Sequence, residues 1–260
     1  MKKYFLIILA LFLIFTNLSA EAAMNLTKKE IEAQAKDGFN IKATLTYPKV
    51  KGQREYSTVV LLHSLGYNSQ WWESLPNELL DKNFAVLTID LRGHGESIYN
   101  SRLGKVSWKS LKNTGYAKYP TDVLAVFEQI KQDYPKMSFF NDWAIIGADI
   151  GASAGVIAAD EMKVRPRTIV MISPVVKTKS LFIPVSVAHL DNVDFLAISG
   201  TGDDDSAQAA NYLKKFAQAD FTSFTSESRT TGMLMLKNDP DLIKMISEWV
   251  NEYLGVTSIE

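Results

Sequence analysis

The chain has 260 residues, of which 47% are hydrophobic and 22% are charged, and its formal net charge is -1. This composition excludes disordered and fibrous proteins and suits one large globular domain with a substantial core. Cysteine is absent, which excludes thiol catalysis, disulfides, thiolate metal sites and a lipid-anchored N-terminal cysteine. Histidine chemistry can come only from His63, His94 or His189.

The N-terminus has the pattern of an export signal. Lys2 and Lys3 precede an apolar run over residues 4–15, and a small-residue stretch ends at Ala22. The run is shorter than the ~20 residues that a helix needs to cross a bilayer, so a retained membrane anchor is the weaker alternative. We expect cleavage after Ala22, which would leave residues 23–260 as one exported domain, periplasmic or secreted.

Charge gives little indication of a macromolecular partner. Loss of residues 1–22 removes two lysines and one glutamate, so the formal net charge becomes -2. A nearly balanced charge gives no argument for nucleic acid or an anionic membrane, and we expect a small-molecule ligand or substrate instead. An internal start at Met24 is the alternative that would leave a cytoplasmic protein.

From Thr58 onward, the predicted strands and helices alternate. Apolar, β-branched runs predict strands buried on both faces of a sheet, and apolar residues at helical spacing predict the helices between them. This alternation favours an α/β fold with a parallel sheet, in which ligands bind at the carboxyl ends of the strands. The predicted strands are 58–63, 84–90, 143–146, 168–173, 193–199 and 221–225, and the predicted helices are 69–80, 121–132, 150–162, 206–217 and 239–254.

Three short motifs follow three of these strands. They are His63–Gly66 (HSLG), Asp90–Ser97 (DLRGHGES) and Gly147–Gly151 (GADIG). In this order they resemble the α/β-hydrolase family, and in particular its dienelactone-hydrolase-like and esterase-like bacterial members. The resemblance extends over essentially the whole chain from about Gly38. It implies an α/β-hydrolase fold, with a mostly parallel central sheet and helices on both faces.

The resemblance implies that the third motif is a nucleophile elbow, a tight strand-to-helix turn that needs small residues at Gly147 and Gly151. The family commonly has serine at the centre of this motif, where the present sequence has Asp149. The backbone amides of Leu65 and Ile150 match the positions of the oxyanion hole.

A second match to the G-x-S-x-G pattern lies at Gly151–Gly155, with Ser153 at its centre. Because the preceding strand is predicted to end at Ile146, Ser153 would lie about one turn inside the next helix. We therefore favour Asp149 at the nucleophile position and keep Ser153 as the alternative nucleophile.

The other two triad positions follow later strands. The family's general-base histidine matches Arg229 in Arg229–Leu234 (RTTGML), and its acid matches Asp203, the first of three consecutive aspartates. Arginine stays protonated and cannot accept a proton from a nucleophile. We expect Arg229 instead to form a charge-assisted pair with Asp149, with Asp203 on the far side of the guanidinium.

These features predict an exported α/β-hydrolase-fold protein that lacks ordinary serine-hydrolase turnover and acts as a pseudoenzyme or ligand-binding module. The alternative hypothesis is an active hydrolase of esters or similar small substrates, with Asp149 or Ser153 as nucleophile. Haloalkane dehalogenases and epoxide hydrolases of this fold use aspartate in this way, but they need histidine to activate the water that releases the ester. Neither hypothesis involves a cofactor or a metal.

Overall fold

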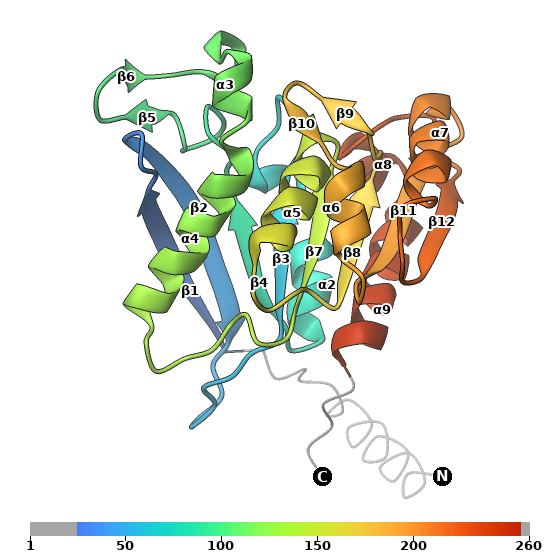
Figure 1. Ribbon diagram of the computed structural model, residues 1–260. Helices are drawn as coiled ribbons and strands as arrows, with labels where there is room; N and C mark the ends of the chain where they lie inside the picture. The colour runs from blue at the N-terminus through green and yellow to red at the C-terminus, as the bar shows by residue number, and fades with distance from the viewer. Residues whose placement is uncertain (1–24, 256–260) are drawn as a thin grey trace, which may run out of the picture.

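A computed structural model describes residues 25–255 of the chain, so the predicted export signal lies outside the described residues. Its centre is a twisted sheet with the strand order β12-β11-β8-β7-β3-β4-β2-β5-β6, and β1 pairs with β2 (Figure 1). Within the described part of the chain, no helix is long and apolar enough to span a membrane.

The middle of the sheet is parallel, as the alternation of elements predicts. Every residue of β3, β7 and β8 is buried, which accounts for their continuous apolar sequences. The α/β-hydrolase fold predicted from the sequence is therefore confirmed. The parallel strands are β3 (Thr58–Leu62), β4 (Ala85–Ile89), β7 (Trp143–Ala148), β8 (Thr168–Ile172), β11 (Asp194–Gly200) and β12 (Phe221–Ser226).

The antiparallel part of the sheet was not among the predicted elements. A long hairpin of β1 (Leu26–Gln34) and β2 (Phe39–Pro48) joins the sheet through β2 and β4. A short hairpin of β5 (Tyr99–Asn100) and β6 (Gly104–Lys105) extends it further. Residues of β2 alternate between buried and partly buried, the pattern of a strand with one face on the core.

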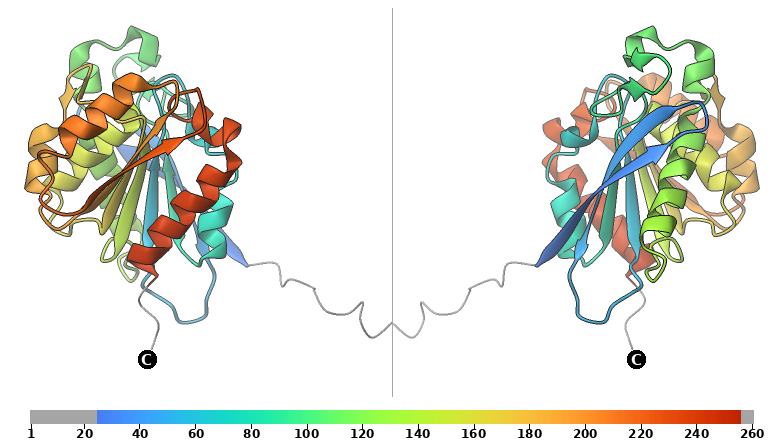
Figure 2. Two further views of the ribbon diagram at one scale, coloured as in Figure 1. Left: turned by 90° about the vertical axis from the view of Figure 1, so that its right-hand side faces the viewer. Right: turned by 90° about the vertical axis from the view of Figure 1, so that its left-hand side faces the viewer.

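Helices cover both faces of the sheet (Figure 2). One face packs against α4 (Tyr119–Asp133), α5 (Ile150–Glu161) and α7 (Asp204–Leu213), and the other against α2 (Leu75–Asp81), α8 (Leu234–Asn238) and α9 (Pro240–Leu254). The remaining short elements are the 3-10 turns η1 (Ser69–Trp71) and η2 (Trp108–Ser110), the helices α3 (Asn113–Tyr116) and α6 (Pro184–His189), and the hairpin strands β9 (Lys177–Thr178) and β10 (Leu181–Phe182).

One predicted helix is divided. The segment predicted as a helix over residues 69–80 consists of η1 followed by α2, which begins only at Leu75. Glu73 between them has a positive φ of 50°, which a continuous right-handed helix does not allow.

Side chains of successive strand residues enter two separate cores. Val60 and Leu62 of β3 pack on the side of α4 and α5, whereas Val59 and Leu61 pack on the side of α2 and α9. Because the parallel strands run in the same direction, the loops that follow β3, β7, β8 and β11 meet at one edge of the sheet. The candidate site lies at this edge.

Candidate functional site

Asp149 lies at the tip of a sharp turn between β7 and α5. It has a positive φ of 51° with ψ of -118°, and α5 begins at the next residue. A Cβ at Gly147 would collide with the backbone of Ala152, and one at Gly151 would collide with the carbonyl of Leu62. The two glycines are therefore needed for the close approach of helix and strand, and the turn has the geometry expected of a nucleophile elbow.

Ser153 is not presented at the site. It lies inside α5, is completely buried, and its hydroxyl has no hydrogen-bond partner within residues 25–255. The structure thus supports the Asp149 register of the elbow over the Ser153 register. The predicted role of Ser153 as alternative nucleophile is not compatible with this position.

The carboxylate of Asp149 faces the backbone amides predicted to form the oxyanion hole. The amide of Leu65 donates to Oδ2 of Asp149 at 3.4 Å, and a hydrogen bond from the amide of Ile150 lowers the carboxyl pKa. Burial is the largest influence and acts in the opposite direction, with a smaller contribution from the nearby charge of Asp203, so the net effect is a raised pKa. Lys179 lowers this pKa through its charge.

Asp203 binds a serine that the sequence analysis did not single out. Its Oδ2 accepts a hydrogen bond from Ser173 Oγ at 2.7 Å, and its Oδ1 accepts one from the amide of Ser206 at 3.3 Å, at the start of α7. Ser173 Oγ in turn accepts from the amide of Gly232 at 2.8 Å. Ser173 was predicted as the last residue of a strand, and this place at a strand's carboxyl end was the available signal.

The expected ion pair between Arg229 and Asp149 is absent from the described residues, and that prediction is wrong. The side chain of Arg229 is exposed and takes part in none of the salt bridges there. Its backbone does lie beside the acid loop, because a Cβ at Gly202 would come within 2.7 Å of the Arg229 carbonyl oxygen. The family's base position is therefore next to Asp203, but the arginine there extends into solvent.

Gly232 and Met233, rather than Arg229, bring the loop after β12 into contact with the His63–Gly66 motif. The amide of Met233 donates to Ser64 Oγ at 3.3 Å, and a Cβ at Gly232 would lie 2.5 Å from that oxygen. Ser64 immediately precedes Leu65, whose amide faces Asp149. Backbone and small side chains thus occupy the space around the elbow.

Both histidines near the site use their ring nitrogens on the backbone. His63 Nδ1 donates to the carbonyl of Ser64 at 2.8 Å, and its Nε2 accepts from the amide of Leu91 at 3.0 Å. His94 Nε2 accepts from the amide of Gly66 at 2.9 Å, and its Nδ1 donates to the Arg92 carbonyl at 3.2 Å. These partners fix the neutral tautomers.

The surroundings of these rings keep them neutral. Burial, together with the neighbouring ring of His94, lowers the pKa of His63 to about 4, and burial also lowers the pKa of His94. The third histidine, His189, is exposed and lies 3.1 Å from Asp160, on another part of the molecule. Within the described residues, no histidine nitrogen is hydrogen-bonded to Asp149 or Asp203.

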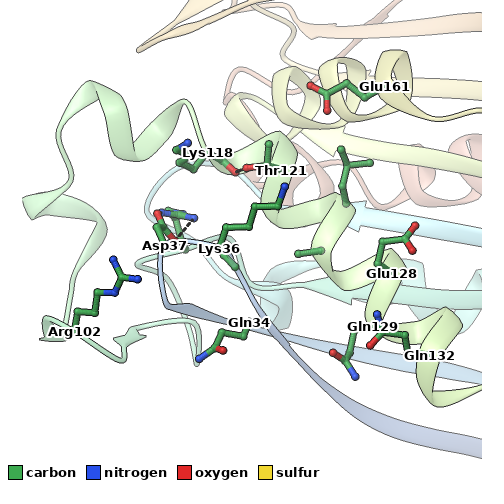
Figure 3. A pocket seen from close by; sticks show the side chains of 14 residues that line it. Gln34, Lys36, Asp37, Arg102, Lys118, Thr121, Glu128, Gln129, Gln132 and Glu161 are labelled. Atoms are coloured by element: carbon green, nitrogen blue, oxygen red, sulfur yellow. Dashed lines mark hydrogen bonds and ion pairs between the residues drawn. The ribbon is translucent and has the colours of Figure 1, made fainter.

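Other binding features lie away from the elbow. A surface groove of about 880 Å³ runs beside the β1–β2 turn and α4, and neither Asp149 nor Asp203 lines it (Figure 3). Among residues 25–255, no group of three or more His, Cys, Asp or Glu side chains could hold a metal ion.

Comparisons with known proteins agree with this fold. The sequence matches the family described as serine aminopeptidase, S33, over residues 53–220. The structure is similar to a dienelactone hydrolase from Anabaena variabilis, with a TM-score of 0.66, 17% identity, and coverage of 88% of this chain and 99% of that one. No curated protein sequence matches the chain.

Two esterases give similar values. A Pyrococcus furiosus esterase has a TM-score of 0.63 at 15% identity, over 88% of this chain and 92% of that one. Esterase B from Lactobacillus rhamnosus has a TM-score of 0.65 at 12% identity, over 97% of this chain and 92% of that one. At these identities the likeness concerns the fold.

Proposed function

Because the chain belongs to the hydrolase family described as serine aminopeptidase, S33, we propose that it keeps this scaffold without serine-hydrolase turnover and binds a small molecule instead. One observation carries the proposal. The carboxylate at the nucleophile position accepts a hydrogen bond from the amide of Leu65, one of the two groups that a serine hydrolase would keep open for its oxyanion.

Within the described residues, no further group at the site is free to act as the base that a nucleophile at the elbow would need. A serine or water nucleophile needs a base within hydrogen-bond reach. Arg229 is always protonated and exposed, and the nitrogens of His63 and His94 are engaged by the backbone. Asp203 is likewise occupied, by Ser173.

A carboxylate nucleophile would not give turnover here either. Asp149 could attack an electrophilic carbon without a base, but the resulting ester would need an activated water for its release. With no base beside Asp149 among the described residues, such a reaction would stop after one covalent addition per molecule. This single addition is what remains of the active-hydrolase alternative.

The proposed ligand is a small carboxylate or ester that displaces Asp149 from the two amides. Backbone amides that converge on one point favour a negatively charged or carbonyl oxygen. The raised pKa of Asp149 helps such an exchange, because a protonated carboxyl group gives up these amides more easily. The N-terminal sequence supports the further proposal that this binding takes place outside the cytoplasm, after export.

Hydrolysis of p-nitrophenyl acetate and butyrate by the purified protein tests the proposal. We expect no release of nitrophenol above that of buffer, and no gain in Asp149→Ser, since a restored serine would still lack a base. Ser153→Ala is the matched control, because it removes a serine next to the elbow that has no part in the site. Turnover that is lost in Asp149→Ala and kept in Ser153→Ala would overturn the proposal.

Binding is measured in parallel by thermal shift. We expect small carboxylates or esters to raise the melting temperature of the wild-type protein. The shift should be larger at acidic than at neutral pH, because protonation of Asp149 frees the two amides. The absence of a shift across such compounds would contradict the binding role.

A further inference from the structure

Basic residues are concentrated in one surface segment, residues 99–118, which joins the loop after β4 to α4. This basic segment contains five lysines and arginines and no aspartate or glutamate, in a chain whose net charge is -1. All five cations are exposed, and none forms an ion pair within residues 25–255. They are Arg102, Lys105, Lys109, Lys112 and Lys118.

The tip of the basic segment is apolar. Leu103, in the turn between β5 and β6, is 74% exposed, the highest value among the exposed large hydrophobic residues of the described chain. It lies between Arg102 and Lys105, and Tyr99 on the same hairpin is 50% exposed. In Figure 1 this hairpin projects from the body of the protein. An aliphatic side chain at a protruding tip, flanked by cations, is placed where it could enter an apolar phase while the charges stay at its boundary.

The base of the segment is firmly attached, so the tip is held out from the surface. The ring of Trp108 stacks on His94 with a centroid distance of 5.5 Å, and its amide donates to the carbonyl of Gly93 at 2.9 Å. Tyr116 Oη donates to the carbonyl of Trp108 at 2.8 Å. Gly93 has a positive φ of 81°, and a Cβ there would come within 2.5 Å of the Trp108 nitrogen.

Further cations lie beside the segment. Ser180, in the β9–β10 hairpin, donates to the carbonyl of Asn113, and the Nζ of Lys179 lies 5.3 Å from the centroid of the Tyr116 ring. Lys36 and Lys118 line the same groove as Arg102, near Asp37, whereas Glu128, Gln129 and Gln132 of the groove lie farther along α4 (Figure 3).

Two acidic residues lie close to the basic segment: Asp37, which is paired with Arg92, and Glu96, which precedes the segment in the chain. Asp204 and Asp205 begin α7, which is separated from the β5–β6 hairpin by α3 and the β9–β10 hairpin in Figure 1. Five cations near Asp37 and Glu96 leave a local excess of positive charge, which the small net charge of the chain conceals.

We propose that the basic segment docks the protein onto an anionic lipid surface, with Leu103 inserted among the acyl chains and the cations on the headgroups. Attraction of clustered lysines and arginines to anionic lipid, together with burial of an apolar tip, is the physical basis of interfacial binding. Single-stranded nucleic acid fits less well, because it is bound by stacking on free aromatic faces. The tip here is aliphatic, Trp108 is already stacked on His94, and Tyr99 is the only exposed aromatic residue of the segment, too few for stacking on successive bases.

Sedimentation with lipid vesicles tests the proposal, using the protein from Ala23 onward, which retains every described residue. We expect binding to vesicles of equal parts phosphatidylcholine and phosphatidylglycerol, and none to phosphatidylcholine alone. Each lost cation should weaken partitioning about fivefold, so Arg102→Gln/Lys105→Gln should lose roughly 25-fold. Leu103→Ser should weaken it severalfold with the charge unchanged.

The loop between β2 and β3 supplies matched controls. Lys49, Val50 and Lys51 repeat the pattern of two cations around an exposed apolar residue, and this loop lies at the opposite end of the molecule (Figure 1). Lys49→Gln/Lys51→Gln and Val50→Ser should bind like the wild type.

Three results would overturn the proposal. One is equal binding to neutral vesicles, and another is an equal loss of binding in the control variants. The third is a Leu103→Ser variant that binds like the wild type while single-stranded DNA displaces the protein from vesicles, since the segment would then recognise soluble polyanions.

Discussion

Asp149 has a backbone conformation that costs a non-glycine residue about 1–3 kcal/mol, and the glycines around it keep the turn in place. Its carboxyl group accepts a hydrogen bond from the amide of Leu65, and the amide of Ile150 lowers its pKa. The expected pairing with Arg229 failed for this reason. A carboxylate at the elbow does not need a guanidinium, because the scaffold already provides donors for an anion at that point.

At the same scale, Ser173 and Ser153 make a matched pair of buried serines. Ser173 bridges Asp203 and the amide of Gly232, whereas the hydroxyl of Ser153 has no partner in the described structure. Ser173→Ala should lower the free energy of unfolding by about 1–3 kcal/mol, because it leaves two buried groups unsatisfied. Ser153→Ala should be neutral or slightly stabilising, because it removes an unpaired buried hydroxyl.

Urea unfolding followed by tryptophan fluorescence measures both serine variants. Equal losses in the two would show that Ser173 contributes only its volume, and that the bridge from Asp203 to the loop after β12 adds no stability.

The lowered pKa of His63 predicts that the stability of the protein depends on pH. Its pKa is about 4 in the folded protein, against about 6.5 in an unfolded chain. A lowered pKa means that the folded state disfavours the proton. The stability contributed by neutral His63 is therefore complete above pH ~6.5 and is lost as the pH falls toward ~4, by about 3 kcal/mol in all.

The variant His63→Gln isolates this contribution of His63. The variant should be less stable than the wild type at pH 7, because glutamine does not reproduce both hydrogen bonds of the buried ring. Glutamine does not take up a proton, so the difference in stability between the two proteins should shrink as the pH falls to 4. Unfolding in urea at a series of pH values measures it. A difference that stays constant over this range would mean that His63 does not titrate as described.

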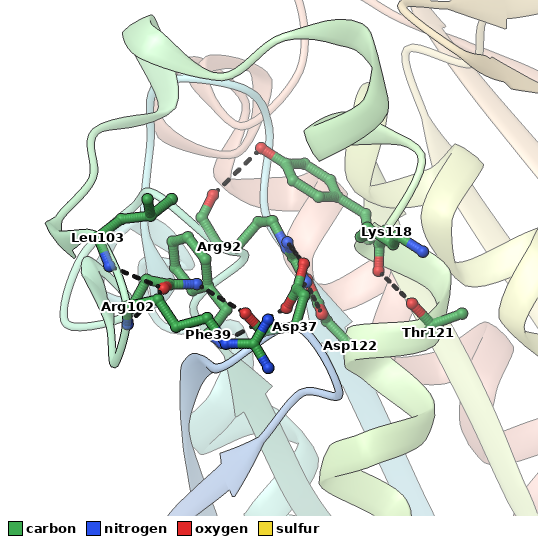
Figure 4. Close-up of polar contacts among 10 residues, drawn as sticks. Asp37, Phe39, Arg92, Arg102, Leu103, Lys118, Thr121 and Asp122 are labelled. Atoms are coloured by element: carbon green, nitrogen blue, oxygen red, sulfur yellow. Dashed lines mark hydrogen bonds and ion pairs between the residues drawn. The ribbon is translucent and has the colours of Figure 1, made fainter.

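At the scale of elements, one buried cation joins three parts of the fold. Arg92, in the loop after β4, forms ion pairs with Asp122 of α4 at 2.5 Å and with Asp37 of the β1–β2 turn at 2.7 Å (Figure 4). Its guanidinium also lies 4.7 Å from the centroid of the Phe39 ring. The network fixes the antiparallel hairpin against α4, next to the base of the basic segment.

Loss of the buried Arg92–Asp122 pair should cost more stability than loss of the partly exposed Arg92–Asp37 pair. Arg92→Met leaves Asp122 buried without its counterion and should cost about 3–5 kcal/mol of unfolding free energy. Asp37→Asn should cost about 1 kcal/mol or less, because the Asp37 side chain is partly exposed to solvent. The double variant Arg92→Met/Asp122→Leu should recover much of the loss, and failure to do so in chemical denaturation would indicate that the pair is not the source of the effect.

For the molecule as a whole, the sequence predicted those elements whose structure depends on a single local pattern. The buried parallel strands and the glycines of the elbow were predicted because continuous apolar runs and tight turns have few alternatives. The hairpin of β1 and β2 was missed. In β1 only Ile31 and Ala33 face the core, among charged neighbours, so its strand structure depends on pairing with β2.

The site was predicted in position but not in its contacts. The resemblance to the α/β-hydrolase family implied that Asp149 and the amides of Leu65 and Ile150 lie together, because these are backbone positions fixed by the fold. The partners of Asp203 and the direction of the Arg229 side chain depend on loop conformations that no local pattern records. The excess of cations in residues 99–118 can be read from the local sequence, whereas the projection of their hairpin from the body of the protein could not.

The position at which β1 begins determines how the domain would be oriented if the N-terminal segment were held in a bilayer. Strand β1 begins at Leu26, paired with Pro48, at the end of the molecule opposite the β5–β6 hairpin (Figure 1). A protein held to a bilayer through residues 4–15 would carry the basic segment on its far side. Contact of that segment with the same bilayer would require the domain to turn over on a short tether. If the chain is exported and docks on lipid as proposed, release from the N-terminal segment would therefore come before docking, and the two attachments would not act together.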